Sequence, residues 1–106
     1  MINRDVFIVI PTIRNLDFLE SWRDEFKDCI GIIVEDHHSK EIMTPQKYFE
    51  KVFNYSWEDI DKELGEDSWI ISRKNSGIRC YGFLKAWQMG AEVIITLDDD
   101  CYQIIV

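Results

Sequence analysis

Three consecutive carboxylates, Asp98, Asp99 and Asp100, end the last apolar segment of the chain in "EVIITLDDDCYQ". In an extended segment side chains alternate, so Asp98 and Asp100 point to one side and Asp99 points to the other. Two carboxylates on one side are able to share a hard divalent cation, and Mg²⁺ prefers a few carboxylates together with waters and phosphate oxygens. Such a cation removes the repulsion between the acids and screens a diphosphate leaving group. The triplet therefore indicates a D-x-D metal site, with a solvated acidic loop as the alternative.

A basic segment leads into this triplet. Residues 68–91 contain four basic residues and no acid, whereas residues 58–67 contain six acids and one lysine. Ser76 and Gly77 are expected at a helix start, where backbone N–H groups are available to an anion. Arg79 lies in the first turn of that helix. The segment suits an anion held together with a metal, and chance segregation on a solvated surface is the alternative.

Polar residues also follow the first two apolar segments. Thr12 and Arg14 come after the first, and Asp36 comes after the second, where its carboxylate can accept a hydrogen bond from a base or a ribose. His37 and His38 are adjacent, but neighbouring histidines rarely bind one ion, and no third ligand has a suitable spacing. They are therefore not predicted to form a metal site.

Short apolar segments alternate with helical patterns along the chain. The predicted strands cover residues 6–10, 30–34, 51–55, 68–72 and 92–97, and the predicted helices cover residues 15–26, 56–65 and 76–89. This alternation predicts an α/β fold, a Rossmann-like and mostly parallel sheet with helices on both faces. Ligands in such sheets bind outside the carboxyl ends of the strands, so the polar residues described above are expected to share one rim.

Two helices have further sequence signals. Ser56 and Asp59 have the spacing of a capping box at the start of the helix at 56–65. The helix at 76–89 is expected to bury the apolar residues Cys80, Phe83, Leu84 and Trp87. The strand at 92–97 is also expected to be buried. The four tryptophans are expected to be core or half-buried packing residues, and Trp57, beside the rim, is the one for which stacking on a base is the alternative.

Composition limits the class of protein. A chain of 106 residues with 46% hydrophobic residues suits one globular domain. The formal net charge of −8 argues against a nucleic-acid partner. No apolar run is long enough to span a membrane, so a cytoplasmic location is expected. The three cysteines have no metal-binding spacing and are expected to be reduced, mostly buried thiols.

Four segments of the sequence resemble a known family. They are "IPTIRNLDFLESWR", "IIVEDHHSK", "NSGIRCYGFLKA" and "ITLDDDCY". Their order and spacing, from about residue 6 to 102, are similar to those of the reversibly glycosylated polypeptides, the UDP-arabinopyranose mutase family. The resemblance implies a GT-A-like fold that binds a UDP-sugar with Mn²⁺ or Mg²⁺. It also implies interconversion of the pyranose and furanose forms of UDP-arabinose for polysaccharide synthesis.

The resemblance also suggests roles for individual positions. By position, Asp98, Asp99 and Asp100 look like the metal and diphosphate motif, Thr12 and Arg14 like the nucleotide-contacting end of the first strand, Asp36 like the acid near the uracil, and Arg79 like the basic residue beside the diphosphate. With Asp98 counted in both groups, the expected nucleotide-binding set is Thr12, Arg14, Asp36, Arg79 and Asp98. No residue is assigned to catalysis.

The sequence departs from the family pattern in two places. His37 and His38 stand where the family usually has an acidic turn that contains glycine, and the family continues far beyond the aspartates. Residues 1–106 are therefore expected to form a single nucleotide-sugar-binding α/β domain, the N-terminal half of a GT-A-like fold truncated after the D-x-D strand. The alternatives are a non-catalytic nucleotide-binding or assembly module, acting in a homo- or hetero-oligomer with full-length homologues, and an inactive fragment.

Overall fold

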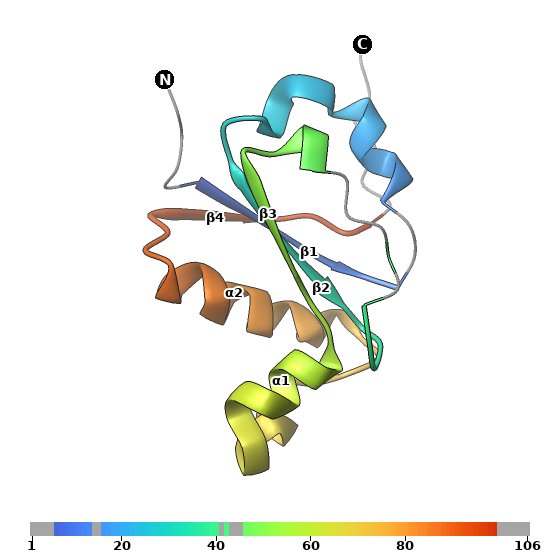
Figure 1. The fold of residues 1–106 in the computed structure, drawn as a ribbon, viewed down its shortest axis with the longest axis vertical. Helices are drawn as coiled ribbons and strands as arrows, with labels where there is room; N and C mark the ends of the chain where they lie inside the picture. Colours follow the sequence, from blue (N-terminus) through green and yellow to red (C-terminus); the bar gives the residue numbers. More distant parts are fainter. Residues whose placement is uncertain (1–5, 14–15, 41, 43–45, 100–106) are drawn as a thin grey trace.

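The centre of the molecule is a four-stranded sheet, shown in the computed structural model (Figure 1). The structure describes residues 6–13, 16–40, 42 and 46–99. The strands are β1 (Val6–Thr12), β2 (Ile30–Glu35), β3 (Lys51–Tyr55) and β4 (Val93–Thr96). They lie in the order β3-β2-β1-β4, and each pair of neighbours is parallel. The predicted α/β fold with a parallel sheet is confirmed, and the strand order is Rossmann-like.

The register of the strands brings their carboxyl ends to one edge of the sheet. Thr12 at the end of β1 pairs with Glu35 at the end of β2. Beyond the strands, the backbone N–H of Asp36 donates to the Thr12 carbonyl at 2.9 Å, and the N–H of Leu97 donates to the Val9 carbonyl at 3.1 Å. The residues that follow β2 and β4 are therefore held beside the end of β1.

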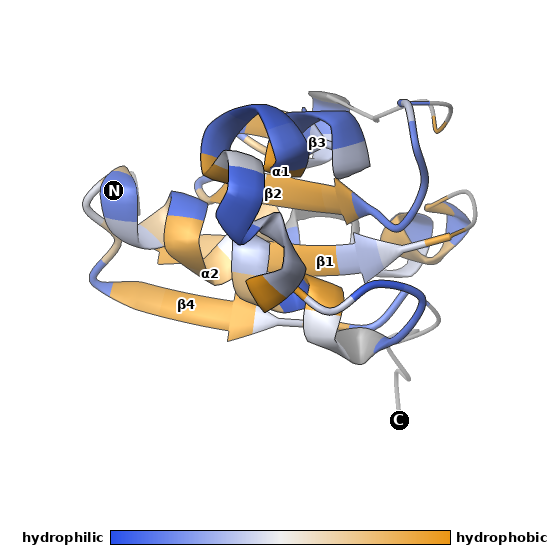
Figure 2. Ribbon diagram, turned by 90° about the horizontal axis from the view of Figure 1, so that it is seen from below, coloured by the Kyte–Doolittle hydropathy of each residue, from blue (hydrophilic) through white to orange (hydrophobic). Residues whose placement is uncertain are grey.

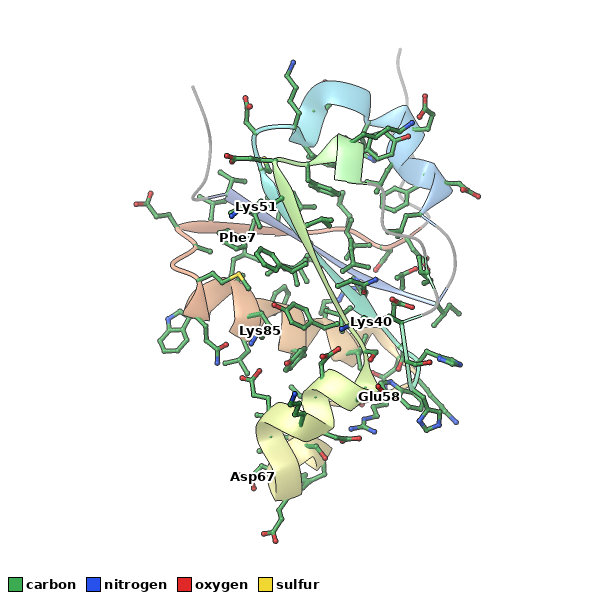
Figure 3. All side chains as sticks on the ribbon, viewed as in Figure 1. Phe7, Lys40, Lys51, Glu58, Asp67 and Lys85 are labelled. Carbon is green, nitrogen blue, oxygen red and sulfur yellow. The ribbon has the colours of Figure 1, made fainter. Side chains whose placement is uncertain are left out.

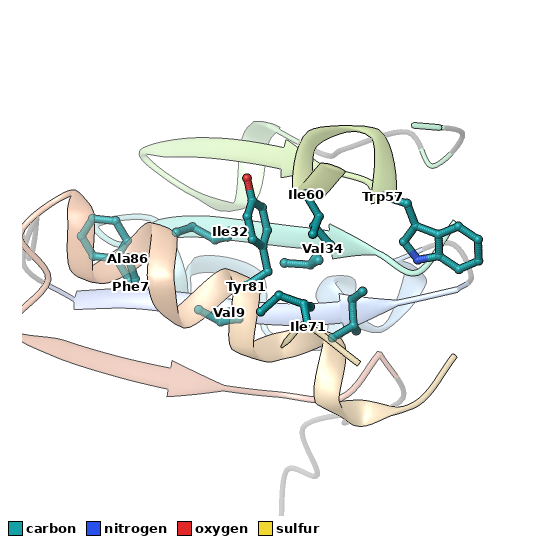
Figure 4. Close-up of a cluster of buried hydrophobic side chains, with 10 residues drawn as sticks. Phe7, Val9, Ile32, Val34, Trp57, Ile60, Ile71, Tyr81 and Ala86 are labelled. Carbon is teal, nitrogen blue, oxygen red and sulfur yellow. The ribbon is translucent and has the colours of Figure 1, made fainter. Parts of the chain in front are cut away.

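Two α-helices, α1 (Trp57–Leu64) and α2 (Arg79–Gln88), cover one face of the sheet. Figure 4 shows the apolar cluster that they form with the sheet. It includes Phe7, Val9, Ile32 and Val34 from the strands and Trp57, Ile60, Tyr81 and Ala86 from the helices. The capping box at the start of α1 is confirmed, since the Asp59 carboxylate accepts a hydrogen bond from the Ser56 backbone N–H at 2.8 Å.

Three short 3-10 helices cover the other face: η1 (Asp17–Ser21), η2 (Arg23–Phe26) and η3 (Gln46–Tyr48). A second apolar cluster lies beneath them. It includes Ile8, Ile10 and Ile33 from the strands together with Leu19, Phe26 and Phe49. Helices therefore lie on both faces, as predicted. The single helix predicted at 15–26 is wrong, because two shorter helices bring the same apolar side chains onto the sheet.

The strand predicted at residues 68–72 is also wrong. After Gly65, whose φ is 53°, the chain continues as the 3-10 helix η4 (Gly65–Ile70). Trp69 and Ile70 are 78% and 61% exposed, so their apolar side chains do not enter the described core. A short apolar run is compatible with either a strand or a helix, and only pairing with a neighbouring strand decides between them. No strand of the described sheet pairs with this segment.

The face that helix α2 turns toward the sheet matches the predicted one only in part: Phe83 and Leu84 are half-buried and pack against the apolar cluster, as predicted. It follows a 3-10 turn, η5 (Ser76–Ile78), and its buried residues are Tyr81, Gly82 and Ala86. Cys80 is exposed and Trp87 is 73% exposed, which contradicts the prediction for these two residues. The close approach of α2 to β1 at Gly82 explains which face of the helix is buried, because a Cβ there would overlap Val9 Cγ1 on β1.

Strand β4 is less buried than predicted. Val93, Ile94 and Ile95 are all exposed, because β1 is the one neighbour of this edge strand in the described sheet. Figure 2 shows β4 as an apolar strand at the border of the molecule. Across the described ranges, no helix combines the length and the apolar character that a membrane crossing requires.

Candidate functional site

A pocket of about 450 Å³ lies at the carboxyl ends of the strands. Its lining residues are Pro11, Thr12, Ile13, Asp36, Lys74, Asn75, Ile78, Arg79, Asp98 and Asp99. They come from the ends of β1, β2 and β4 and from the segment that opens α2. Five of the residues that were expected at one rim therefore line one pocket: Thr12, Asp36, Arg79, Asp98 and Asp99.

Asp99 is fixed against the end of β1. The Thr12 hydroxyl donates to Asp99 Oδ2 at 2.9 Å, and the backbone N–H of Ile13 approaches the same oxygen at 3.3 Å. Thr12 is only 3% exposed, so the packing around its side chain holds the hydroxyl donor in place. The two contacts orient the Asp99 carboxylate at the pocket wall.

Arg79 and Asp98 form the charged pair of the pocket. The Arg79 guanidinium bonds to Asp98 Oδ1 through Nη2, and its Nη1 donates to Thr96 Oγ1 at 3.1 Å. Arg79 is the first residue of α2, and Thr96 and Asp98 stand at the end of β4. Thr96 was not among the predicted site residues, since a threonine in a β-branched strand has no distinguishing sequence signal. The pair places a cation and an anion side by side. A phosphate group can replace the Asp98 carboxylate as the partner of the Arg79 guanidinium.

Asp36 has a partner that the sequence did not reveal. The Trp57 indole N–H donates to Asp36 Oδ1 at 2.7 Å. Trp57 is 9% exposed, the Arg73 guanidinium lies 5.3 Å from its ring centroid, and the His38 ring meets it edge-on at 4.8 Å. Trp57 is thus a packed residue that bonds to Asp36, and the alternative that it stacks on a base is wrong.

The segment before α2 corrects one further expectation. Gly77 does not offer its N–H to an anion, because the Asn75 side chain accepts it at 2.7 Å. Asn75 also donates to Ser72 Oγ at 2.8 Å, so its side chain bonds to residues on both sides of it in the loop. Lys74 has a positive φ of 61° and lines the pocket, so it is a second basic residue there besides Arg79. The sequence alone did not select Lys74 and Asn75 as pocket residues.

The remaining predicted site residues lie outside the described residues. These are Arg14 and Asp100. Within the residues that are described, no group of three or more His, Cys, Asp or Glu side chains could hold a metal ion. His37 and His38 are both exposed, and their ring centroids lie 6.0 Å apart. Asp98 and Asp99 line the same pocket, so the prediction that they point to opposite sides is wrong, because β4 ends at Thr96 and the alternation of a strand does not continue to these residues. The metal assignment of the triplet stays a prediction, with Asp98 and Asp99 as its described members.

The parallel sheet and the charged pocket at its carboxyl edge define a Rossmann-like α/β domain. The model of one family, "Reversibly glycosylated polypeptide", matches residues 1–105. The chain belongs to this family, which confirms the resemblance seen in its sequence motifs.

Several curated proteins are similar to the chain over 103 residues, or 96% of its length. Identity is 41% with UDP-arabinopyranose mutase 2 of Arabidopsis thaliana, 42% with UDP-arabinopyranose mutase 3 of the same plant, and 39% with UDP-arabinopyranose mutase 1 of Oryza sativa subsp. japonica. The matched region is 27% of each of these proteins. The chain thus spans about a quarter of the length of these curated relatives.

Proposed function

We propose that the pocket binds the nucleoside diphosphate part of a UDP-sugar, as the nucleotide-binding portion of a UDP-sugar mutase or glycosyltransferase-like protein. One observation carries the proposal: Thr12, Asp36, Arg79, Asp98 and Asp99 converge on one pocket at the carboxyl edge of the sheet. Similarity to proteins named UDP-arabinopyranose mutase supports the choice of ligand.

The basic side chains of the pocket bind the diphosphate in this proposal. Arg79 offers a planar set of donors that matches phosphate oxygens, and Lys74 adds a second positive charge. In the described structure Arg79 is paired with Asp98, so a diphosphate takes over one side of the guanidinium while Thr96 keeps the other. Asp36 accepts a hydrogen bond from the base or the ribose.

The proposal includes Mn²⁺ or Mg²⁺ as a cofactor. The donors present fit such an ion, because Asp98 and Asp99 line the same pocket and supply the hard carboxylate oxygens that these cations prefer. Asp98, Asp99 and Asp100 would hold the ion. When bound, it would neutralise charge on the diphosphate. Thr12 fixes Asp99, and Arg79 contacts Asp98, so this chain itself orients both described carboxylates.

The reaction in this proposal is the interconversion of the pyranose and furanose forms of a UDP-sugar. The bond between the anomeric carbon and the UDP oxygen breaks, and a second sugar hydroxyl bonds to the anomeric carbon and loses its proton. The original ring C–O bond then breaks, its oxygen takes up a proton, and a UDP phosphate oxygen bonds to the anomeric carbon again. No oxidant or reductant is needed. Arg79 and Lys74 stabilise the negative charge that develops on UDP as the bond breaks.

A second function uses the same pocket. The chain is also proposed as a nucleotide-binding or assembly module that binds UDP without turnover. In this form it associates with itself or with full-length homologues in the cytoplasm. The two functions share the pocket and differ in catalysis.

Calorimetric titration of the 106-residue chain with UDP in the presence of Mn²⁺ tests the shared part. Wild type is expected to show saturable binding that Arg79→Gln weakens about tenfold or more, because a charged hydrogen-bond donor to phosphate is lost. Lys62→Gln on the exposed side of α1 is the matched control and is expected to bind UDP as wild type does. Absence of binding by wild type would refute the proposal. Incubation with UDP-arabinopyranose, followed by product analysis, then separates the mutase from the binding module.

A further inference from the structure

We propose that Trp57 is a positioning residue that holds the Asp36 carboxylate as a hydrogen-bond acceptor for the nucleoside part of the ligand. The inference rests on the proposed function and goes beyond it, because it assigns a role to a tryptophan outside the pocket lining. The donor on the ligand is a base N–H or a ribose hydroxyl, since either one can bond to a carboxylate oxygen.

Two hydrogen bonds fix Asp36. Its backbone N–H donates to the Thr12 carbonyl at 2.9 Å, which anchors the main chain to the end of β1. Its Oδ1 accepts the Trp57 indole N–H at 2.7 Å. Among the described residues, Trp57 is the one side chain that bonds to the Asp36 carboxylate. Asp36 also lines the pocket, so in this proposal its second carboxylate oxygen faces the ligand.

Trp57 is itself held in place from several sides. Its backbone N–H donates to the His37 carbonyl at 2.8 Å, so the start of α1 is tied to the turn that follows Asp36. Its ring is nearly buried and is flanked by Arg73, whose guanidinium also pairs with Asp61 on α1. The indole N–H is therefore a rigid donor, and its direction is determined by the packing of α1 against the sheet.

A rigid donor at Oδ1 has a chemical consequence. Indole N–H is a donor only, so the atom that faces it must be an acceptor. In Asp36→Asn, the amide oxygen must therefore face Trp57, and the amide NH₂ takes the place of the second oxygen. A donor then faces the donor of the ligand, and UDP binding is expected to fall about tenfold.

The decisive variant combines Asp36→Asn with Trp57→Phe. Phenylalanine preserves much of the packing but has no N–H, so the amide is able to turn its oxygen toward the ligand. The double variant is expected to bind UDP more tightly than Asp36→Asn alone. Loss of packing could not produce such a rescue, because it would weaken binding in either background. Trp69→Phe, at a tryptophan that is 78% exposed, is the matched control and is expected to leave UDP binding unchanged.

Calorimetric titration with UDP distinguishes the outcomes. Rescue of Asp36→Asn by Trp57→Phe supports the inference. Losses that add in the double variant, or an Asp36→Asn variant that binds as wild type does, overturn the inference while the proposed function stands. Absence of UDP binding by wild type overturns the proposed function and this inference together.

A second comparison leaves Trp57 intact in case Trp57→Phe does not fold. If Trp57 directs the amide, Asp36→Asn binds UDP no better than Asp36→Ala. An Asp36→Asn variant that binds much better than Asp36→Ala overturns the inference. Titration with 3-methyl-UDP, 2′-deoxy-UDP and 3′-deoxy-UDP identifies the donor on the ligand. The loss of affinity that Asp36→Asn causes is expected to disappear for the analogue that lacks this donor. A loss of affinity that is the same for UDP and all three analogues overturns the acceptor role.

Discussion

The hydroxyl of Thr12 donates a hydrogen bond of 2.9 Å to the carboxylate of Asp99, 87 positions later in the chain. The bond joins the end of β1 to the segment after β4, two strands that are neighbours in the sheet but lie at opposite ends of the described sequence. It places an acid of the Asp98–Asp100 triplet in the same pocket as residues from the first strand. The pocket is therefore a product of the parallel sheet and not of any local motif.

Thr12→Val tests the contribution of this bond to stability. Valine has nearly the same shape but no hydroxyl, so the variant is expected to lose about 1–2 kcal/mol of unfolding free energy, as a buried donor to a charged group is removed. Urea unfolding measures the loss. Thr12→Ser keeps the hydroxyl and is expected to lose less than Thr12→Val. Equal losses in the two variants would show that the methyl group, and not the bond to Asp99, stabilises the fold.

Gly82→Ala tests the close approach of α2 to the sheet. Alanine in a helix is ordinarily more stable than glycine by about 1 kcal/mol. Here the added Cβ would overlap Val9 Cγ1 and lie 3.2 Å from Val34 Cγ2, so a net destabilisation of about 1–3 kcal/mol is expected. Thermal or urea unfolding shows whether Gly82→Ala lowers or raises the free energy of unfolding. Cys80→Ala, on the exposed side of the same helix, is the control and is expected to change little. A stabilised Gly82→Ala variant would contradict the packing described here.

Glu63 is expected to make stability depend on pH. Hydrogen bonds from Lys85 at 2.9 Å and Gln88 at 3.0 Å, followed by one from Tyr81 at 2.8 Å, lower the pKa of Glu63 from 4.5 to about 2, against the opposing effect of burial. These bonds tie α1 to α2, and Figure 3 shows Lys85 among the side chains of α2.

A group whose pKa is lower in the folded chain stabilises the fold above its unfolded pKa. The contribution of Glu63 is therefore complete above about pH 5 and is lost as the pH falls from 4.5 toward 2. Glu63→Gln is expected to cost about 1 kcal/mol at pH 7, since solvent screens this partly exposed site, and almost nothing near pH 2. Urea unfolding of both proteins over this pH range measures the difference. A gap between the two proteins that stays constant with pH would contradict this role.

Much of the fold could be predicted because strand periodicity and capping are local signals. The β-branched runs at β1 and β2 and the Ser56–Asp59 capping pair directly indicate their structures. Residues 68–72 could not be assigned correctly, because a short apolar run becomes a strand only when a neighbouring strand accepts it. The buried face of α2 was predicted only in part for a similar reason: both of its sides carry apolar residues, and Gly82 decides between them only through contact with Val9.

The site was predictable to the extent that it depends on topology. The rule that ligands bind at the carboxyl ends of parallel strands predicts that Thr12, Asp36 and Asp99 lie together. The bond from Trp57 to Asp36, and the bond from Arg79 to Thr96, depend on side-chain directions across elements, which sequence spacing does not encode. The use of the Gly77 N–H by Asn75 was missed for the same reason.

The central claim is that the pocket binds UDP together with a divalent cation held by the acid triplet. Its most direct test is titration of the wild-type chain with UDP, first in Mn²⁺ and then in EDTA, beside Asp98→Asn and the surface control Glu66→Gln. Wild type and Glu66→Gln are expected to show saturable binding in Mn²⁺, and binding is expected to be at least tenfold weaker in EDTA or in Asp98→Asn. UDP binding that is equally tight in EDTA and in Asp98→Asn, or no UDP binding at all, would contradict this claim.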